Sequence, residues 1–503
     1  MKKTKYLHIA IIILGIIFIT IPVFHNNLWF DESYSVAIAN NHSFNEIWTI
    51  GGHDVHPVFY YWMLKIVSMI FGNNMVCYRL LSVLSIALLG ILGYTHIRKD
   101  FGEKVGAIFS LLVYTFPVNL VYASEIRMYG WAMFFVMVMA IYAYRIFSNK
   151  KALQENKLEK RDIKNWVIFA IFSLISAYTH YYALATAGII NLLLFIYLLK
   201  NAIKQKSYTK ELKSFTISAI VQIILYIPWL YSLLNQITGV SKGYWISAPS
   251  AKLLLQIFCF QFTGNLDIMF VPQWTSVALG IILLIYCIYC AIANKGEKTA
   301  GRLAIGVYLI VFVTMYIISL KTPILYARYF LNLTGLFIFF MAFFIAKDKN
   351  KLLTIMICLI TLAVAILVNL NVSKMNYAEN NKVPLEYVKQ DLQQGDMILF
   401  GNRGSGFTIS MQLVDVPNCF YDYENWNVEP AYKAFGKEMI YTNNIETLEN
   451  YKGRIWIVNS DNYSIYEEFK EKYGDRIELI KQEIFNTEYH GYNYSICLIE
   501  KDN

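Results

Sequence analysis

The sequence has 503 residues, of which 57% are hydrophobic and 16% are charged, and its mean hydropathy is +0.42. A soluble domain carries about 25% charged residues, so the composition excludes an ordinary soluble protein and predicts an integral membrane protein. The net charge of +9 arises before residue 373, because acids outnumber bases beyond it. Membrane topology explains this distribution better than nucleic-acid binding does.

Apolar runs that could cross a bilayer, which takes about 20 residues, recur along most of the chain. The first, Leu7 to Phe24, follows the basic stretch MKKTKY. This start is similar to that of a signal peptide, but no small-residue cleavage site follows, so a retained helix is expected. The further runs cover 77–97, 104–120, 128–147, 165–180, 182–199, 214–233, 274–293, 302–320, 329–346 and 352–370. The sequence therefore predicts a polytopic α-helical protein with about eleven transmembrane helices.

The loops between these runs indicate the orientation. If Met1 is cytoplasmic, every inner loop is rich in lysine or arginine, as in HIRKDFGEK and KNAIKQKSYTKELK, whereas the outer loops hold few. Cytoplasmic loops of membrane proteins carry such an excess of basic residues. We therefore expect a multi-pass protein of the plasma membrane with a cytoplasmic N-terminus. It would have a membrane domain over 1–372, a long first outer loop over 25–76 and an outer C-terminal tail.

The tail, residues 373–503, has the pattern of a soluble extracytoplasmic α/β domain. LEYVKQDLQQGDMILFGN predicts a helix, a glycine turn and an apolar strand, and IETLENYKGRIWIVNSD and YEEFKEKYGDRIELIKQE repeat this order. Alternation of helix and strand favours a largely parallel or mixed sheet. Cys419 and Cys497 could pair if the tail is outside.

Ionisable residues are scarce in the middles of the apolar runs and gather at the outer ends. Ion-coupled transporters need ionisable residues within the membrane. The scarcity of such residues in the middles of these runs therefore argues against an ion-coupled transporter. A cavity at the outer membrane surface would collect them and would suit a lipid phosphate, because arginine binds phosphate through bidentate hydrogen bonds. The segments are WFDESYS (29–35), GGHDVHP (51–57), ASEIRMYGW (123–131), YTHYY (178–182), KGYWISAPS (242–250) and TPILYARYF (322–330), together with Arg79.

Two adjacent carboxylates, Asp31 and Glu32, follow the first apolar run. A sugar that leaves from a lipid phosphate needs little acid assistance, so one carboxylate suffices as the general base for an acceptor hydroxyl. Glycoside hydrolysis, in contrast, uses two. We predict that Asp31 is this base; alternatively, Asp31 only caps the helix expected over ESYSVAIAN. Glu32 could position Asp31 or a metal ion, or could face water.

The chain resembles bacterial GT-C glycosyltransferases of the family 39 kind, which are relatives of protein O-mannosyltransferases and of lipid A aminoarabinose transferase. WFDESYS is similar to the family's acidic motif in the first outer loop, and ASEIRMYGW to its Glu-x-Arg-Met-Tyr motif. HDVHPVFYYWMLK is similar to its His-Pro-Pro-Leu-Tyr-Tyr segment, with Val58 in place of the second proline. YTHYYAL, YIPWLYSLLNQ followed by GYW, and ARYFLNL fall in the expected order, so the resemblance covers about 1–345.

The resemblance implies an inverting glycosyltransferase that moves a sugar from a polyprenyl-phosphate donor to an acceptor hydroxyl on the outer face, with Asp31 as the catalytic base. Tyr34 stands where the aminoarabinose branch has an arginine, which puts a lipid A substrate in doubt. The acceptor stays open among a protein, a teichoic-type polymer, a glycolipid and another polyprenol-linked glycan. The alternative is a lipid-linked sugar flippase, which should show polar residues through the membrane depth and internal repeats.

The remaining polar residues are candidates for substrate binding. Arg79, Arg127 and Arg328 are predicted to bind the donor phosphate. Arg127 could instead form a surface pair with Glu125. The other substrate-binding candidates are His53, Asp54, His56, Glu125, Tyr129, His180, Tyr181 and Tyr329. The tyrosines could instead be interfacial aromatics, and His180 a structural residue.

A metal ion is a further option for the first outer loop. Imidazole and carboxylate ligands suit several divalent ions, so His53, Asp54 and His56 could ligate Mn²⁺, Mg²⁺ or Zn²⁺. Alternatively, His56 caps a helix that begins at Pro57. No cofactor is otherwise implied.

Overall fold

The computed structural model describes residues 2–242, 246–264, 273–293, 296–401, 404–413, 415–424, 435–436, 439–460 and 464–502. The chain divides into two compact units. The first comprises Met1–Ile21, Asp54–Tyr60 and Arg79–Asn371. The second comprises Pro22–His53, Tyr61–Tyr78 and Val372–Asn503.

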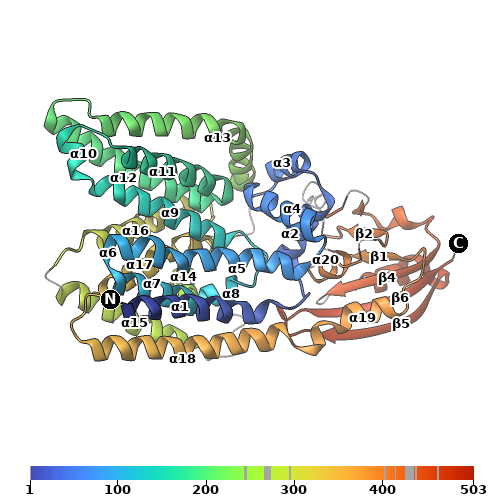
Figure 1. Ribbon diagram of the computed structural model, residues 1–503. Coiled ribbons are helices and arrows are strands. Elements are labelled where there is room, and N and C mark those ends of the chain that lie inside the picture. Colours follow the sequence, from blue (N-terminus) through green and yellow to red (C-terminus); the bar gives the residue numbers. More distant parts are fainter. Residues whose placement is uncertain are drawn as a thin grey trace. The chain divides into compact units, whose positions relative to one another are not determined.

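The first unit is built from helices (Figure 1). Those that lie wholly or mainly in it are α1 (Lys2–Thr20), α5 (Met75–Leu92), η2 (Gly93–Ile97), α6 (Arg98–Phe101), α7 (Glu103–Thr115), α8 (Pro117–Tyr122), α9 (Tyr129–Ser148), α10 (Lys150–Glu155), α11 (Lys160–Thr179), α12 (Tyr181–Gln205), α13 (Lys210–Lys242), α14 (Ala251–Thr263), α15 (Gln273–Ala293), α16 (Thr299–Ser319), η3 (Ala327–Leu333), α17 (Thr334–Ile345) and α18 (Lys351–Asn376).

Eight helical segments in the described parts of the chain are long and apolar enough to cross a membrane. They are Thr4–Val23, Met75–Phe101, Tyr129–Ser148, Tyr181–Gln205, Lys210–Ser241, Thr299–Ser319, Ala327–Ile345 and Lys351–Asn376. Each coincides with one of the apolar runs predicted from the sequence. The other three runs, 104–120, 165–180 and 274–293, fall on α7 with α8, on α11 and on α15. The polytopic helical fold is therefore confirmed, whereas the predicted count of eleven spans is not.

A proline explains why the run 104–120 is not one helix. α7 ends at Thr115, Phe116 is extended with φ −73° and ψ 124°, and α8 begins at Pro117. The ring of a proline disfavours helical backbone at the residue before it, and proline is favoured at the first position of a new helix. The apolar run therefore forms two short helices.

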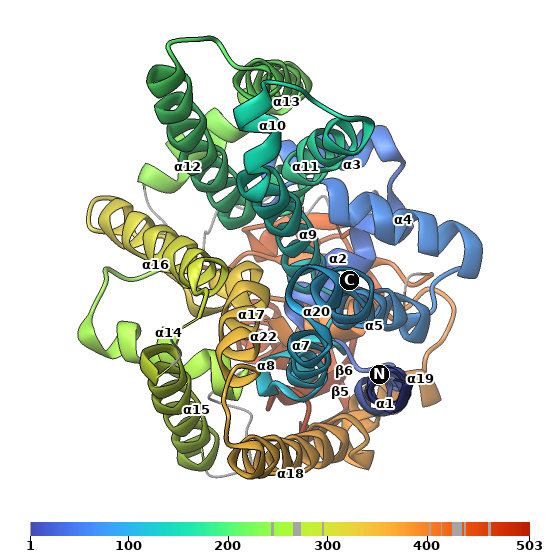
Figure 2. The same ribbon diagram turned by 60° about the vertical axis from the view of Figure 1, so that its left-hand side comes forward.

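The interior of the first unit lies around α17. All twelve residues of α17 are buried, and the helix packs against α7, α9, α15 and α16 (Figure 2). A helix that is apolar on every side belongs inside a bundle. α13, in contrast, exposes apolar side chains such as Ile223 and Leu225, as expected of a helix that faces lipid.

The second unit contains a mixed six-stranded sheet, which confirms the expected C-terminal α/β domain. Its strand order is β3-β2-β1-β4-β6-β5. β1 pairs in parallel with β2 and β4, and β2 with β3, whereas β6 is antiparallel to β4 and β5. The strands are β1 (Met397–Phe400), β2 (Asn418–Tyr421), β3 (Ile440–Thr442), β4 (Gly453–Ser460), β5 (Ile477–Asn486) and β6 (Asn493–Lys501).

Helices from two distant parts of the sequence complete the second unit. α2 contacts α20, and the ring of Phe30 lies 5.3 Å from that of Phe407. The segment that carries Asp31 thus packs on a helix of the C-terminal sheet domain. The helices are η1 (Ile21–Val23), α2 (Phe30–Asn41), α3 (Phe44–His53), α4 (Phe59–Phe71), η4 (Glu379–Asn381), α19 (Val383–Gln390), α20 (Gly404–Ser410), η5 (Ile445–Leu448), α22 (Ile465–Tyr473) and η6 (Gly474–Arg476).

The two cysteines of the tail are not bonded to each other. Cys419 lies on β2 and Cys497 on β6, and β1 and β4 separate these strands. Burial raises the pKa of both thiols to about 12. The suggested disulfide is therefore wrong, and both side chains serve as small apolar residues of the core.

Candidate active site

His180 is the centre of a polar cluster in the first unit. It lies between α11 and α12. Its ring centroid is 6.1 Å from that of His56, 5.6 Å from that of Tyr129 and 5.3 Å from that of Tyr329. Residues from the segment before α4, the start of α9 and η3 thus surround one histidine, as their shared depth in the sequence pattern predicts.

Arg127 brings a buried positive charge to this cluster. Its side chain is 3% exposed, and its Nη2 lies 3.5 Å from Nε2 of His56. Nδ1 of His56 lies in turn 3.4 Å from Oδ2 of Asp54. Because a guanidinium can only donate hydrogen bonds, Nε2 of His56 accepts from it and Nδ1 carries the proton toward the Asp54 carboxylate. Asp54 and His56 therefore help to orient Arg127.

His180 remains neutral in this setting. Its Nδ1 accepts a hydrogen bond of 3.2 Å from the backbone N–H of Tyr182, which caps the start of α12. Burial, and then the neighbouring His56 and Arg127, lower the pKa of His180 well below its ordinary value. The proton of the neutral ring then sits on Nε2. His180 thus has a structural role and also presents a hydrogen-bond donor.

Arg79 holds the turn that presents Arg127. Arg79 is fully buried and donates a hydrogen bond to the carbonyl of Ser124. The hydroxyl of Ser82 donates to the carbonyl of Glu125 at 2.5 Å, and that carbonyl also accepts from the N–H of Arg127 at 2.8 Å. Glu125 is 5% exposed. The alternative of a solvent-exposed pair between Glu125 and Arg127 is therefore wrong.

The tyrosines divide into two groups. The ring of Tyr182 lies 5.9 Å from His180 and 5.4 Å from Tyr329, within the cluster. Tyr181 points elsewhere: its hydroxyl donates to Gln236 and accepts from the indole of Trp229 at 3.1 Å. Successive helical residues face different directions. The sequence therefore identified the segment YTHYY but missed Tyr182.

Arg328 lies in η3 beside the cluster. It is half-buried, with its guanidinium carbon 5.1 Å from the ring centroid of Tyr326. Its charge also contributes to the lowered pKa of His180. The segment GYW that accompanied these motifs in the sequence, residues 243–245, lies outside the described residues.

Asp31 and Glu32 lie in the first turn of α2, in the second unit. The N-cap residue of this helix is Trp29. The carboxylate of Glu32 is fully buried and accepts hydrogen bonds from the N–H of Trp29 at 3.3 Å and from the hydroxyl of Tyr489 at 2.8 Å. Glu32 therefore supports the helix start and does not face water. The reading of Asp31 as only an N-cap is wrong.

The residues suggested as metal ligands do not form a ligand set. His53 is exposed at the end of α3, and its Nδ1 lies 2.9 Å from the carbonyl of Thr49. In the described parts of the chain, no group of three or more His, Cys, Asp or Glu side chains could hold a metal ion. α4 begins at Phe59, so His56 does not cap a helix at Pro57.

The buried bond between Tyr489 and Glu32 predicts a stability effect. Tyr489→Phe should lower the melting temperature of the purified protein by several degrees, because a hydrogen bond to a charged group contributes about 1.5–3 kcal/mol. Tyr466→Phe alters another buried ring of the same unit and should change the melting temperature little. Equal melting temperatures for Tyr489→Phe and the wild type would show that this bond does not stabilise the protein.

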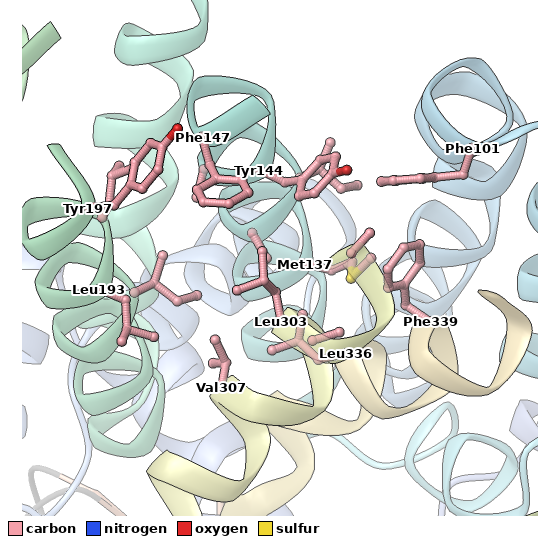
Figure 3. Close-up of a pocket in the computed structure, with 17 residues that line it drawn as sticks. Phe101, Met137, Tyr144, Phe147, Leu193, Tyr197, Leu303, Val307, Leu336 and Phe339 are labelled. Carbon is pink, nitrogen blue, oxygen red and sulfur yellow. The ribbon is translucent and has the colours of Figure 1, made fainter. Parts of the chain in front are cut away.

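An apolar cavity of about 230 Å³ lies farther along the same helices. Figure 3 shows side chains of α9, α12, α16 and α17 around it, with the rings of Tyr144, Phe147 and Tyr197 at one side. The first residue of α9 that lines this cavity is Met137. At a rise of about 1.5 Å per residue, Met137 lies about 12 Å along the helix from its start at Tyr129. Almost all of the lining surface is carbon, so the cavity suits a hydrocarbon chain.

Comparisons with known proteins agree with this architecture. A family model described as dolichyl-phosphate-mannose-protein mannosyltransferase matches residues 55–232. A search of curated proteins finds no match. Among solved structures, ArnT from Cupriavidus metallidurans bound to undecaprenyl phosphate is similar at a TM-score of 0.60 and 10% identity, over 98% of this chain and 97% of that one. Its apo state is similar at a TM-score of 0.54 and 12% identity, over the same shares.

The family match covers the segments that carry His56, Arg127 and His180, although not η3, and the shared fold extends over nearly the whole chain. Both findings agree with the resemblance drawn from the motifs. The chain therefore shares the fold of ArnT over nearly its whole length, and its residues 55–232 are similar to the mannosyltransferase family.

Proposed function

We propose that this protein is a membrane glycosyltransferase of the GT-C type. It moves a sugar from a polyprenyl-phosphate donor to an acceptor hydroxyl at the outer face of the plasma membrane, with inversion at the anomeric carbon. The buried Arg127 beside His56, His180 and Tyr129 carries this proposal. A buried guanidinium among aromatic rings suits a phosphate that must leave water. The binding of undecaprenyl phosphate by ArnT supports a lipid-linked donor.

The donor phosphate binds Arg127 and Arg328 in this proposal. Asp54 and His56 orient Arg127, and Arg79 fixes the turn from which it projects. The neutral His180 donates a further hydrogen bond from Nε2. The rings of Tyr129 and Tyr329 offer apolar faces for the sugar.

The transfer itself needs one base. The carboxylate of Asp31 removes the proton of the acceptor hydroxyl as its oxygen attacks the anomeric carbon. The bond from that carbon to the phosphate oxygen breaks, and its electrons leave with the polyprenyl phosphate. The arginines stabilise the charge on the departing phosphate. Attack opposite to the leaving phosphate inverts the anomeric centre.

The stereochemistry tests this mechanism. Purified protein would receive a polyprenyl-phosphate sugar of defined anomeric configuration, and the glycosidic bond of the product would be assigned by NMR. The opposite configuration is expected. A product with the configuration of the donor would require a glycosyl-enzyme intermediate and would contradict direct attack.

We further propose that the apolar cavity between α9, α12, α16 and α17 accommodates the isoprenoid tail of the donor. The N-terminus is cytoplasmic in this arrangement, residues 1–372 form the membrane domain, and residues 373–503 form an extracytoplasmic domain. The basic inner loops support this orientation. In this orientation the donor reacts at the outer membrane surface, where its phosphate is in contact with water.

Filling the apolar cavity should weaken the use of long-chain donors. Ala140→Phe places a ring in the lining, and the loss of about 60 Å² of buried apolar surface costs about 1.5 kcal/mol at about 25 cal/mol per Å². We expect kcat/KM for an undecaprenyl donor to fall about tenfold, with little change for a donor of two or three isoprene units. Ala363→Phe, on an exposed position of α18, is the matched control. An equal loss with both donors would show that the cavity does not hold the tail.

A further inference from the structure

A second cavity, of about 520 Å³, lies entirely within the second unit. This volume falls within the range of roughly 300–1,000 Å³ that small-molecule sites occupy. Three parts of the chain line it: residues 24–28 before α2, residues 376–389 around η4 and α19, and the region of α20 with the turn between β5 and β6. None of the roles proposed for the donor uses this cavity.

The lining is polar, in contrast to the cavity of the first unit. Amide side chains come from Asn26, Asn27, Asn381 and Gln412. Amides both donate and accept hydrogen bonds, as sugar hydroxyls do. The lining tyrosines Tyr377, Tyr489, Tyr492 and Tyr494 add aromatic faces and hydroxyls. Such a surface matches a polyhydroxylated ligand with carbon faces, and does not match a hydrocarbon chain.

Asn376 provides an independent sign that the cavity takes a polar ligand. It lines the cavity and is 2% exposed. Its Nδ2 donates to the carbonyl of Pro22 at 2.8 Å, whereas its Oδ1 has no hydrogen-bond partner in the described part of the chain. An unsatisfied buried polar atom costs about 1–3 kcal/mol. A ligand hydroxyl can remove this cost by donating to Oδ1.

The charges around the cavity balance. Glu379 and Glu386 face Lys382 and Lys389 in equal number, and Lys382 lies 3.3 Å from the carboxylate of Glu379. A site for a polyanion would show an excess of basic side chains. The balance therefore favours an uncharged ligand.

The wall of this cavity is bonded to the residues on either side of Asp31. Tyr489 donates to the carboxylate of Glu32 at 2.8 Å, and the hydroxyl of Tyr492 accepts from the N–H of Phe30 at 3.0 Å. The hydroxyl of Tyr492 also carries a proton that it can donate to a ligand, and burial raises its pKa further. A ligand in the cavity thus lies beside the start of α2.

We propose that this cavity binds an uncharged saccharide of the acceptor and places it beside Asp31; the assignment of the ligand as an acceptor rests on the proposed function. Among the acceptor classes left open by the sequence, a neutral glycan fits the lining. A polypeptide or a glycerol-phosphate polymer is the competing outcome of the test.

The test uses the full-length protein in fluorescent nanodiscs on an array of printed glycans, glycerol-phosphate oligomers and unglycosylated peptides. We expect binding to uncharged glycans. Gln412→Trp, which fills the cavity, and Asn26→Ala, which removes an exposed amide at its rim, should each lower this binding at least tenfold. The matched controls Gln390→Trp and Asn493→Ala alter exposed residues that do not line the cavity, and should bind within twofold of the wild type.

Binding to peptides or glycerol-phosphate oligomers alone, no glycan binding, or equal glycan binding by Gln412→Trp and the wild type would overturn the inference. A transfer assay separates this result from a failure of the proposed function. If wild-type protein transfers sugar and Gln412→Trp has an unchanged KM for the acceptor, only the saccharide site is wrong. If the glycans bind through the cavity but no donor supplies sugar, the saccharide site stands and the proposed transferase reaction is wrong.

Discussion

Asp31→Asn should reduce sugar transfer by about 10²- to 10⁴-fold, which is the usual contribution of general base catalysis. Asparagine has nearly the same shape as aspartate but cannot accept the proton of the acceptor hydroxyl. The start of α2 should persist, because Glu32 and not Asp31 makes the capping bond to Trp29. The measurement is the initial rate of transfer from a radiolabelled polyprenyl-phosphate sugar, with binding of undecaprenyl phosphate measured in parallel.

The matched control for this substitution is Asp475→Asn, at an exposed position of the C-terminal domain. It should transfer sugar at the wild-type rate. The wild type, Asp31→Asn and Asp475→Asn should bind undecaprenyl phosphate with equal affinity. If Asp31→Asn transferred sugar as fast as the wild type, the base would have to be another group.

Arg127→Ala should weaken binding of undecaprenyl phosphate by about 10- to 150-fold. A hydrogen bond to a charged group contributes about 1.5–3 kcal/mol, and each 1.4 kcal/mol is a factor of ten in affinity. The effect should be large because Arg127 is 3% exposed and water cannot replace it easily. The affinity can be measured by the increase in melting temperature on titration with undecaprenyl phosphate.

Two further variants test whether the loss of affinity comes from the geometry and position of the Arg127 guanidinium. Arg127→Lys keeps the charge but loses the planar, bidentate geometry, so its affinity should lie between those of Arg127→Ala and the wild type. Arg161→Ala removes an exposed arginine at the start of α11 and should bind like the wild type. Unchanged affinity in Arg127→Ala would place the donor phosphate elsewhere.

Much of the fold could be predicted from local patterns. The span Tyr129–Ser148 follows from a continuous apolar run, and the mixed sheet follows from repeated helix–strand alternation in the tail. Pro117 was visible in the sequence, yet hydropathy averaged over 104–120 concealed the break that it causes. This break accounts for one of the three predicted runs that are not among the eight spans.

The candidate site was predictable in its segments but not in its side chains. Outer-end motifs indicated His56, Arg127, His180 and Tyr329, because polar residues at one depth can share a cavity. The choice of Tyr182 over Tyr181 depends on the rotation of α12. The bond from Tyr489 to Glu32 joins residues 457 positions apart, and no pattern in either segment indicates the other. Such pairings depend on tertiary packing, which local sequence does not encode.

Sugar incorporation by the purified protein tests the central proposal most directly. Wild-type protein in nanodiscs would receive a panel of radiolabelled polyprenyl-phosphate sugars, with membrane extract as the source of acceptor. We expect at least one donor to label the acceptor and to release polyprenyl phosphate, and we expect Asp31→Asn to do neither at a comparable rate. No incorporation from any donor, with lipid-linked sugar crossing the bilayer of reconstituted vesicles, would contradict the proposed reaction and favour a flippase.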